Sequence, residues 1–232
     1  MTGPTSVRGA LRATVLLGAA EGTTLDVLAA ASKWRTLQKD EILFVAGSRA
    51  SSVFVVAAGT LRVFTTGPGG SEPILALLSP GDLVGELGVL DDIPRSTSVS
   101  ALRQSDIVEV PARAFRDAYD SDPAIARRLV SMLSERMRSL NDGFTDLASL
   151  DLGGRLAKYL LSEAERHGKP SFRMSLTQAE LGQLLGGARQ SVNQVMQALE
   201  RTGLVETTGR TVHILDRDGL RNRANTPGGK IF

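Results

Sequence analysis

The sequence predicts an α+β fold in which a small roll of short strands is followed by one long helix and a helical C-terminal third. Between residues 41 and 111, short runs rich in valine and phenylalanine alternate with glycine, proline and aspartate, which is typical of small all-β domains. From Pro123 the apolar residues change to helical spacing, and after residue 176 two helical segments flank a pair of glycines. With 232 residues the chain is long enough for two domains.

The composition excludes several classes of protein. Hydrophobic residues make up 42% and charged residues 22% of the chain, as in a folded protein. There is no cysteine and there are two histidines, His167 and His213, so we expect no iron-sulfur cluster, no haem and no metal site. The apolar run from Ala13 to Ala20 is much shorter than the roughly 20 residues of a membrane-spanning helix. Two arginines precede it, as in a signal peptide, but we interpret it as an N-terminal helix of a cytoplasmic protein with no membrane partner.

The roll is expected to occupy residues 1–120, together with an N-terminal helical extension. Strands are expected within residues 41–58, 59–66, 74–78, 83–84, 98–101 and 107–110, with a turn at Gly67-Pro68-Gly69-Gly70. That glycine-rich turn lacks the lysine of a nucleotide-hydrolysing loop. The chain also shows no pattern of a nucleophile with its base and no metal-ligand spacing, so we do not expect an enzyme.

A long helix is expected over residues 121–150. Asp122 can cap a helix that begins at Pro123, where the missing amide proton costs little. Leu133, Met137, Leu140, Phe144 and Leu147 follow at the spacing of a coiled-coil seam. The pattern favours a dimerisation helix, and packing of this helix against its own roll is the alternative.

Residues 151–232 are predicted to form a winged helix-turn-helix domain. Thr177 and Glu180 have the spacing of a capping box, which starts a first helix, and the chain turns at Gly186-Gly187. A second helix begins near Arg189 and ends before Gly203, and two strands, at 204–206 and 211–215, flank a turn with Arg210 at its tip.

The second helix carries the chemistry of a DNA-reading surface. Val192, Val195, Met196 and Leu199 form its buried stripe, and Arg189, Gln190, Asn193, Gln194 and Gln197 lie on its other faces. Amides can pair with adenine and guanidinium groups with guanine in the major groove. Residues 151–232 also carry 12 basic and 8 acidic side chains, against 15 and 17 in residues 1–150. Double-stranded DNA is therefore the expected partner, and a helix-turn-helix used for protein contact is the alternative.

Three segments together resemble the Crp/Fnr (catabolite activator protein) family of transcription regulators, from about Leu25 to Leu220. GDLVGELGVLDDIPRSTS, residues 81–98, is similar to the phosphate-binding cassette of that family. LDLGGRLAKYLL, residues 150–161, is similar to the hinge and the first helix of the family's DNA-binding domain, and TQAELGQLLGGARQSVNQVMQALE to its helix-turn-helix. The resemblance implies a cyclic-nucleotide-binding β-roll, a homodimer, a palindromic operator, and RNA polymerase as a further partner.

The resemblance also implies site residues. For cAMP or cGMP they are Val63, Gly85, Glu86, Leu87, Arg95, Ser96, Thr97, Arg136 and Asn141. Glu86 would take the ribose 2′-hydroxyl, and Arg95 with Ser96 the cyclic phosphate, which suits a carboxylate acceptor and an arginine fork. An ion pair of Arg95 with Glu86, Asp91 or Asp92 is the alternative. For DNA the implied residues are Thr177, Gln178, Arg189, Gln190, Asn193, Gln194 and Arg210.

Several positions depart from the family pattern. Leu140 stands where nucleotide-responsive members present a threonine to the adenine amino group, and Asn141 stands where the partner subunit's hydroxyl residue is usual. Thr97 replaces a small apolar residue. These departures leave open a regulator that binds DNA without a nucleotide, or a nucleotide-sensing module that acts on a protein. In the recognition helix, Gln190 replaces a glutamate and Gln194 an arginine, so we expect an altered operator with more A·T preference.

Overall fold

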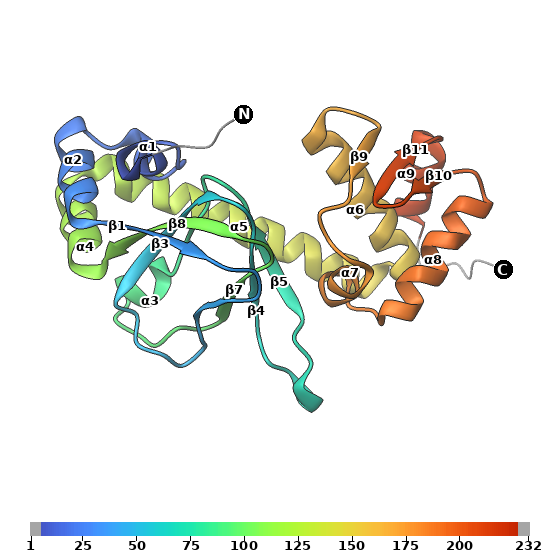
Figure 1. Ribbon diagram of the computed structural model, residues 1–232, viewed down its shortest axis with the longest axis horizontal. Helices are drawn as coiled ribbons and strands as arrows, with labels where there is room; N and C mark the ends of the chain where they lie inside the picture. The colour runs from blue at the N-terminus through green and yellow to red at the C-terminus, as the bar shows by residue number, and fades with distance from the viewer. Residues whose placement is uncertain (1–5, 227–232) are drawn as a thin grey trace. The chain divides into compact units, whose positions relative to one another are not determined.

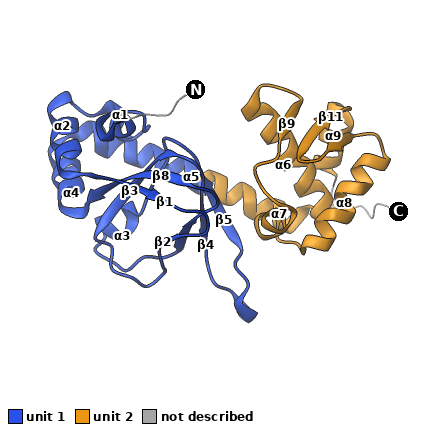
Figure 2. Cartoon of the chain, in the orientation of Figure 1, with its two compact units in different colours: residues 1–137 blue, residues 138–232 orange. Residues whose placement is uncertain are grey.

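The computed structural model describes residues 6–226, and Figure 1 shows its elements. The chain divides into two compact units, Met1–Met137 (unit 1) and Arg138–Phe232 (unit 2), which Figure 2 shows in different colours. The long helix α5 (Pro123–Ser149) passes from unit 1 into unit 2. Among the described residues, no helix has both the length and the apolar character needed to cross a membrane.

Unit 1 contains two antiparallel sheets of four strands, in the orders β1-β8-β3-β6 and β2-β7-β4-β5. The strands are β1 (Lys33–Leu37), β2 (Ile42–Phe44), β3 (Ser52–Ala58), β4 (Leu61–Phe64), β5 (Ile74–Leu78), β6 (Leu83–Val84), β7 (Ser98–Ala101) and β8 (Ser105–Pro111). Side chains alternate along β3: Phe54 and Val56 join a core shared with the second sheet, whereas Val53 and Val55 face the helices. The predicted roll is confirmed, and β1 joins it from a segment that the sequence pattern did not indicate.

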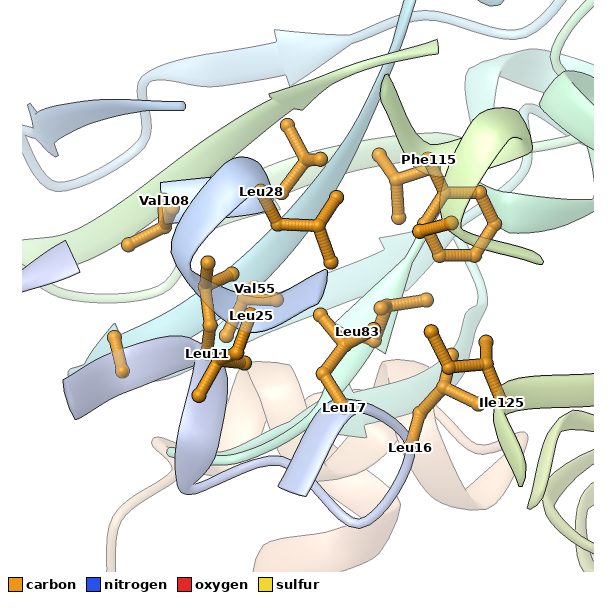
Figure 3. Packing of buried hydrophobic residues seen from close by; sticks show 14 of the residues in the cluster. Leu11, Leu16, Leu17, Leu25, Leu28, Val55, Leu83, Val108, Phe115 and Ile125 are labelled. Atoms are coloured by element: carbon orange, nitrogen blue, oxygen red, sulfur yellow. The ribbon is translucent and has the colours of Figure 1, made fainter. Parts of the chain in front are cut away.

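Helices cover the other face of the first sheet. They are α1 (Val7–Arg12), α2 (Gly22–Ala31) and α4 (Ala112–Ser121), with the first turns of α5. Figure 3 shows leucines of the N-terminal segment packed with Val55, Phe115 and Ile125 in one buried cluster. Two short 3-10 helices, η1 (Leu17–Ala19) and η2 (Pro68–Gly70), and the helix α3 (Glu86–Leu90) complete unit 1.

The prediction of one helix over residues 13–20 is wrong. The chain turns there instead, between α1 and η1. The cause is Thr14, which is buried and whose hydroxyl donates to the carbonyl of Leu11 (2.9 Å) and accepts from the amide of Leu17 (2.8 Å). A hydroxyl that bonds to nearby backbone groups competes with helix formation, so the segment is broken at this residue.

The long helix begins where the sequence predicts. α5 starts at Pro123, and the Asp122 carboxylate accepts a hydrogen bond from the amide of Ala124 (2.9 Å). Its first turns bury Ile125 and Leu129, and Leu133 of the predicted seam packs half-buried on the same core. Farther along the seam, the exposed apolar side chains are Met137, Leu140, Phe144 and Leu147, at 56–75% of their surface.

Unit 2 combines helices with one small sheet. After α5 come α6 (Leu152–His167), β9 (Ser171–Arg173), α7 (Gln178–Leu185), α8 (Arg189–Arg201), β10 (Val205–Thr208), β11 (Thr211–Ile214) and α9 (Arg217–Asn225). The strand order is β10-β11-β9, and β10 pairs with β11 around a two-residue turn at Gly209 and Arg210. The winged helix-turn-helix is confirmed, while β9 and α9 are elements that the sequence pattern did not indicate.

Candidate functional sites

In unit 1, the cassette consists of one short helix and the loop that follows it. β6 ends at Val84, Gly85 adopts a left-handed conformation with φ of 90°, and α3 begins at Glu86. A Cβ atom on Gly85 would lie 2.4 Å from Nη1 of Arg95, so glycine is required both for this backbone conformation and for the close approach of the guanidinium. The two ends of the cassette therefore meet at Gly85 and Arg95.

The Arg95 side chain is buried, between Gly85 and residues of two strands. Its Nη1 donates to the carbonyl of Gly85 (2.7 Å) and its Nη2 to the carbonyl of Ser52. The guanidinium carbon lies 4.3 Å from the centre of the Phe44 ring, within the range of a cation–π contact. Burial lowers the pKa of Arg95, and the nearby Glu86 carboxylate offsets part of that effect, so the side chain remains a cation.

Among the described residues, Arg95 forms no ion pair with Glu86, Asp91 or Asp92, and two of these carboxylates bind other arginines. Asp92 accepts from Arg116 (2.9 Å), and Glu86 accepts from Arg136. Arg136 lies on α5 and also donates to the carbonyl of Leu83. It therefore connects the long helix to the start of the cassette inside unit 1.

Glu86 is the most unusual group of the cassette, because its carboxylate is almost completely buried. Burial raises the pKa of Glu86, although Arg136, a backbone hydrogen bond and Arg95 act in the opposite direction. Its Oε1 pairs with Arg136, while Oε2 accepts no hydrogen bond from any described residue. Leaving such an acceptor without a donor costs about 1 to 3 kcal/mol. The arrangement thus suits a ligand that brings a hydroxyl to Oε2.

The remaining predicted nucleotide residues lie at different depths. Ser96 is exposed and Thr97 half-buried in the loop before β7, Leu87 is 45% exposed on α3, and Val63 is half-buried on β4, the neighbour of β7. Asn141 belongs to unit 2, where it is exposed on α5.

Sequence reasoning missed Phe44 and Ser52, which hold the Arg95 guanidinium. They lie on β2 and β3, about 50 residues and 40 residues away from Arg95 along the chain. The sequence of neither strand indicates that the Phe44 ring or the Ser52 carbonyl will contact an arginine.

In unit 2, the helix-turn-helix is held by a capping box and by glycines. The Glu180 amide donates to the Thr177 hydroxyl (3.2 Å), and the Thr177 amide donates to the Glu180 carboxylate (2.6 Å). α7 ends at Leu185, and Gly186, which has a φ of 67°, caps it. A Cβ atom on Gly182 would lie 2.5 Å from the carbonyl oxygen of Gly187, so this glycine sets the distance between α7 and the turn.

α8 exposes the side chains that the sequence assigns to DNA. Arg189, Gln190, Gln194 and Gln197 are exposed, Asn193 is half-buried, and the Asn193 side-chain oxygen accepts from Gln178 of α7 (3.1 Å). The buried face consists of Val192, Met196, Ala198 and Leu199. Val195, predicted to be buried, is only half-buried, whereas Ala198, which the predicted stripe does not include, is buried, in a helix that contacts both α6 and α7.

Arg210 occupies the wing turn but is not a free side chain. Its Nη2 donates to the carbonyls of Met174 (3.2 Å) and Ser175 (3.0 Å), just before the exposed Thr177 that caps α7. The wing is therefore joined to the start of the helix-turn-helix, and Thr177 and Arg210, which the resemblance implies for DNA, lie on neighbouring segments.

Comparison with known proteins finds a family match in each unit. Residues 34–122 match the cyclic nucleotide-binding domain, and residues 154–223 match the Crp-like helix-turn-helix domain. The chain is 30% identical over 187 residues to a CRP-like cAMP-activated global transcriptional regulator of Mycobacterium tuberculosis, covering 78% of this chain and 84% of that one. It is also 30% identical over 197 residues to the cAMP-activated global transcriptional regulator Vfr of Pseudomonas aeruginosa, covering 81% and 92%.

Solved structures share the fold. FixK2 from Bradyrhizobium japonicum superposes with a TM-score of 0.76 at 22% identity, over 85% of this chain and 99% of that one. Three observations lead to one assignment: the roll with its cassette, the helix-turn-helix, and the relatives that match this chain across both units. The chain belongs to the Crp/Fnr family of DNA-binding transcription regulators.

Proposed function

We propose that this regulator is a homodimer whose affinity for a palindromic DNA operator changes when cAMP or cGMP binds to the cassette of unit 1. The observation that carries the proposal is the buried Glu86 carboxylate near the cation of Arg95, one oxygen of which receives no hydrogen bond from residues 6–226. The relatives from Mycobacterium tuberculosis and Pseudomonas aeruginosa, both named as cAMP-activated, support it.

Each group of the cassette has a chemical part in the proposal. Glu86 Oε2 accepts from the ribose 2′-hydroxyl, while the exposed Ser96 hydroxyl and Arg95 meet the cyclic phosphate. Arg95 directs two hydrogen bonds to backbone carbonyls, and a guanidinium has five N–H donors, so donors remain for a phosphate oxygen. Leu87 and Val63 offer apolar surface to the purine, with Gly85, Thr97 and Arg136 around it. In the proposed dimer, Asn141 would be contributed by the partner subunit.

Calorimetric titration with cAMP and with cGMP tests the ligand. We expect binding in the micromolar range for the natural protein, and a loss of at least about tenfold for Arg95→Gln, which removes the cation. Arg103→Gln is the matched control, because Arg103 is an exposed arginine of the same roll. Absence of binding, by calorimetry and by a second equilibrium method, would rule out nucleotide control.

On DNA, we propose that Arg189 reads a guanine, and that Gln190 and Gln194 favour A·T pairs in each half-site. Asn193 and Gln178 lie beside them, and Thr177 and Arg210 would contact phosphates. Selection of binding sites from a random pool should return a palindrome with half-sites about one helical turn apart. Return of the common family operator would contradict the specificity proposed for the two glutamines.

The proposed mechanism is a shift between two populations of the dimer. A nucleotide can favour the DNA-binding population only if it binds that population more tightly. The second candidate, DNA binding without a nucleotide, is favoured by Leu140, whose apolar side chain on α5 cannot pair with a purine edge. Operator affinity that is equal with and without saturating nucleotide would select it. RNA polymerase is the further partner that we propose for the bound regulator.

A further inference from the structure

The helix α9, at the C-terminal end of the described chain, contacts the junction between α5 and α6. Arg223 of α9 donates through Nη2 to both carboxylate oxygens of Asp151, at 2.6 and 2.7 Å. The same carboxylate caps α6, because its Oδ1 accepts from the amide of Gly154 (2.8 Å). The Asp151 side chain therefore joins the first turn of α6 to α9, which begins more than 60 residues later in the sequence.

The packing around Arg223 shows that this contact is built into the fold. The arginine side chain is 13% exposed, and a Cβ atom on Gly153 would lie 2.1 Å from its Nη2. Gly153 and its neighbour Gly154 thus leave room for the guanidinium. In contrast, Arg221 on the same helix pairs with Asp218 at the surface, where its side chain is 53% exposed. Such exposed pairs contribute little, whereas the Arg223 guanidinium is largely buried and its partner Asp151 is half-buried, with 34% of its side chain exposed. Loss of Asp151 as a partner would leave the buried cation without its counter-charge.

Asp151 stands at the break between the two helices. Its backbone is extended (φ −72°, ψ 174°), so α5 ends at Ser149 and α6 begins at Leu152. Burial alone would raise the pKa of Asp151, but the hydrogen bonds from Arg223 and Gly154 and the charge of Arg223 lower it below its usual value. The carboxylate is therefore held ionised, as a cap and as the partner of Arg223.

Other bonds connect the same break to the helix-turn-helix. Arg155 of α6 donates to the carbonyl of Leu150 and to that of Leu185, the last residue of α7 (2.8 Å for the latter). Lys158 of α6 pairs with Asp146 of α5 (2.7 Å). These bonds connect the end of α5, the start of α6 and the end of α7 within unit 2. Arg223 binds Asp151, which lies between α5 and α6.

We infer that Arg223 is a positioning residue for operator binding: by holding Asp151, it fixes the break between α5 and α6 and thereby the direction in which α5 presents the helix-turn-helix. The competing view is that Arg223 only anchors α9 to the domain. The two views differ in what they predict for a single half-site. DNA reading by one domain needs the domain fold alone, whereas the gain from a second half-site needs both domains at a fixed spacing.

The test compares Arg223→Gln, Gly153→Ala and Asp151→Asn with the control Arg221→Gln. Asparagine still caps a helix, so Asp151→Asn removes the ion pair without removing the cap. Alanine at Gly153 should displace Arg223, although alanine is otherwise the better helix former. Amide hydrogen exchange is expected to accelerate at least about fivefold over residues 152–155 in all three variants and to stay unchanged in α8. The control should match the natural protein.

DNA binding supplies the second readout, and this arm rests on the proposed dimer. Affinity for the selected palindrome should fall by about 3-fold to 30-fold in the three variants, while affinity for a half-site duplex changes by less than about twofold. Equal losses on both duplexes, or faster exchange throughout α7 and α8, would reduce Arg223 to an anchor of the domain fold. A natural protein with no preference for the palindrome would refute the proposed dimeric binding instead, and the exchange experiment would still decide the role of Arg223.

Discussion

At the scale of single residues, Gly85 and Arg95 depend on each other. Gly85→Ala would place a Cβ 2.4 Å from Nη1 of Arg95 in a backbone with positive φ. Gly47→Ala is a close control, because Gly47 has a φ of 80° but no atom within 4 Å of the added Cβ. Both variants should lose about 1 to 2 kcal/mol of unfolding free energy from the backbone conformation alone.

Displacement of Arg95 should add to that loss only in Gly85→Ala. We expect this variant to be about 1 to 3 kcal/mol less stable than Gly47→Ala in denaturant unfolding, because the buried guanidinium loses its carbonyl partners. Only Gly85→Ala should also lose nucleotide binding. If the two variants prove equally stable, the contact between Gly85 and Arg95 contributes nothing measurable to the free energy of unfolding.

Glu86 predicts a dependence of stability on pH. Its folded-state pKa is raised above the ordinary value of 4.5, so the native state binds the proton more tightly than the unfolded state does. Relative to Glu86→Gln, which does not titrate, the natural protein should therefore lose stability as the pH rises from 4.5 through the raised pKa. Chemical unfolding of both proteins without nucleotide, between about pH 4 and pH 8, measures the difference. A constant difference, or one of opposite sign, would contradict the effect of burial.

At the scale of secondary-structure elements, the contact between α7 and the turn depends on Gly182. Gly182→Ala would bring a Cβ to 2.5 Å from the Gly187 carbonyl oxygen, a backbone atom that cannot move without displacing α8. We expect a loss of about 1 to 3 kcal/mol in unit 2 and a large loss of DNA binding. Gly143→Ala is the control: the added Cβ has no neighbour within 4 Å, and alanine should stabilise α5 slightly. Normal operator binding by Gly182→Ala would contradict this account.

Elements with strong local signals could be predicted from the sequence. The structure confirms three of them: the capping box at Thr177, the start of α5 at a proline, and the short strands separated by turns. Each of these signals depends on residues that are neighbours in the sequence. β1 and β9 could not be predicted in this way, because each is defined by pairing with a strand far away, as Trp34 is with Val108. Likewise, the cassette motif located Glu86 and Arg95, but the orientation of Arg95 is set by Ser52 and Phe44, which the motif does not contain.

At the scale of the whole molecule, α5 is the element that takes part in both units. Its Arg136 binds Glu86 in unit 1, and its Asp146 pairs with Lys158 in unit 2. A Cβ atom on Gly186, at the turn of the helix-turn-helix, would lie 3.1 Å from Leu147 of α5. A change at the cassette that moves Arg136 therefore acts on the same helix that meets the turn of the helix-turn-helix. This continuity gives the proposed nucleotide response a physical route, provided that α5 has two stable arrangements in the dimer.

The dimer itself can be tested through the exposed end of α5. Phe144 is 75% exposed, and Leu140 is 61% exposed, in the region where the predicted seam leaves the core of unit 1. Burying such side chains against a second copy contributes roughly 1.5 to 3 kcal/mol each, and a symmetric pair loses two of them with every substitution. Phe144→Ser should thus raise the dissociation constant of the dimer by at least about 100-fold.

Sedimentation velocity over a range of concentrations measures this change, with Ser139→Ala as the control because Ser139 is exposed on the same helix. The serine variant should also bind the palindromic operator little better than a half-site, since its two domains are no longer linked. A natural protein that is monomeric throughout the range would disprove the dimer. If Phe144→Ser remained as dimeric as the natural chain, the interface would have to lie elsewhere on the molecule.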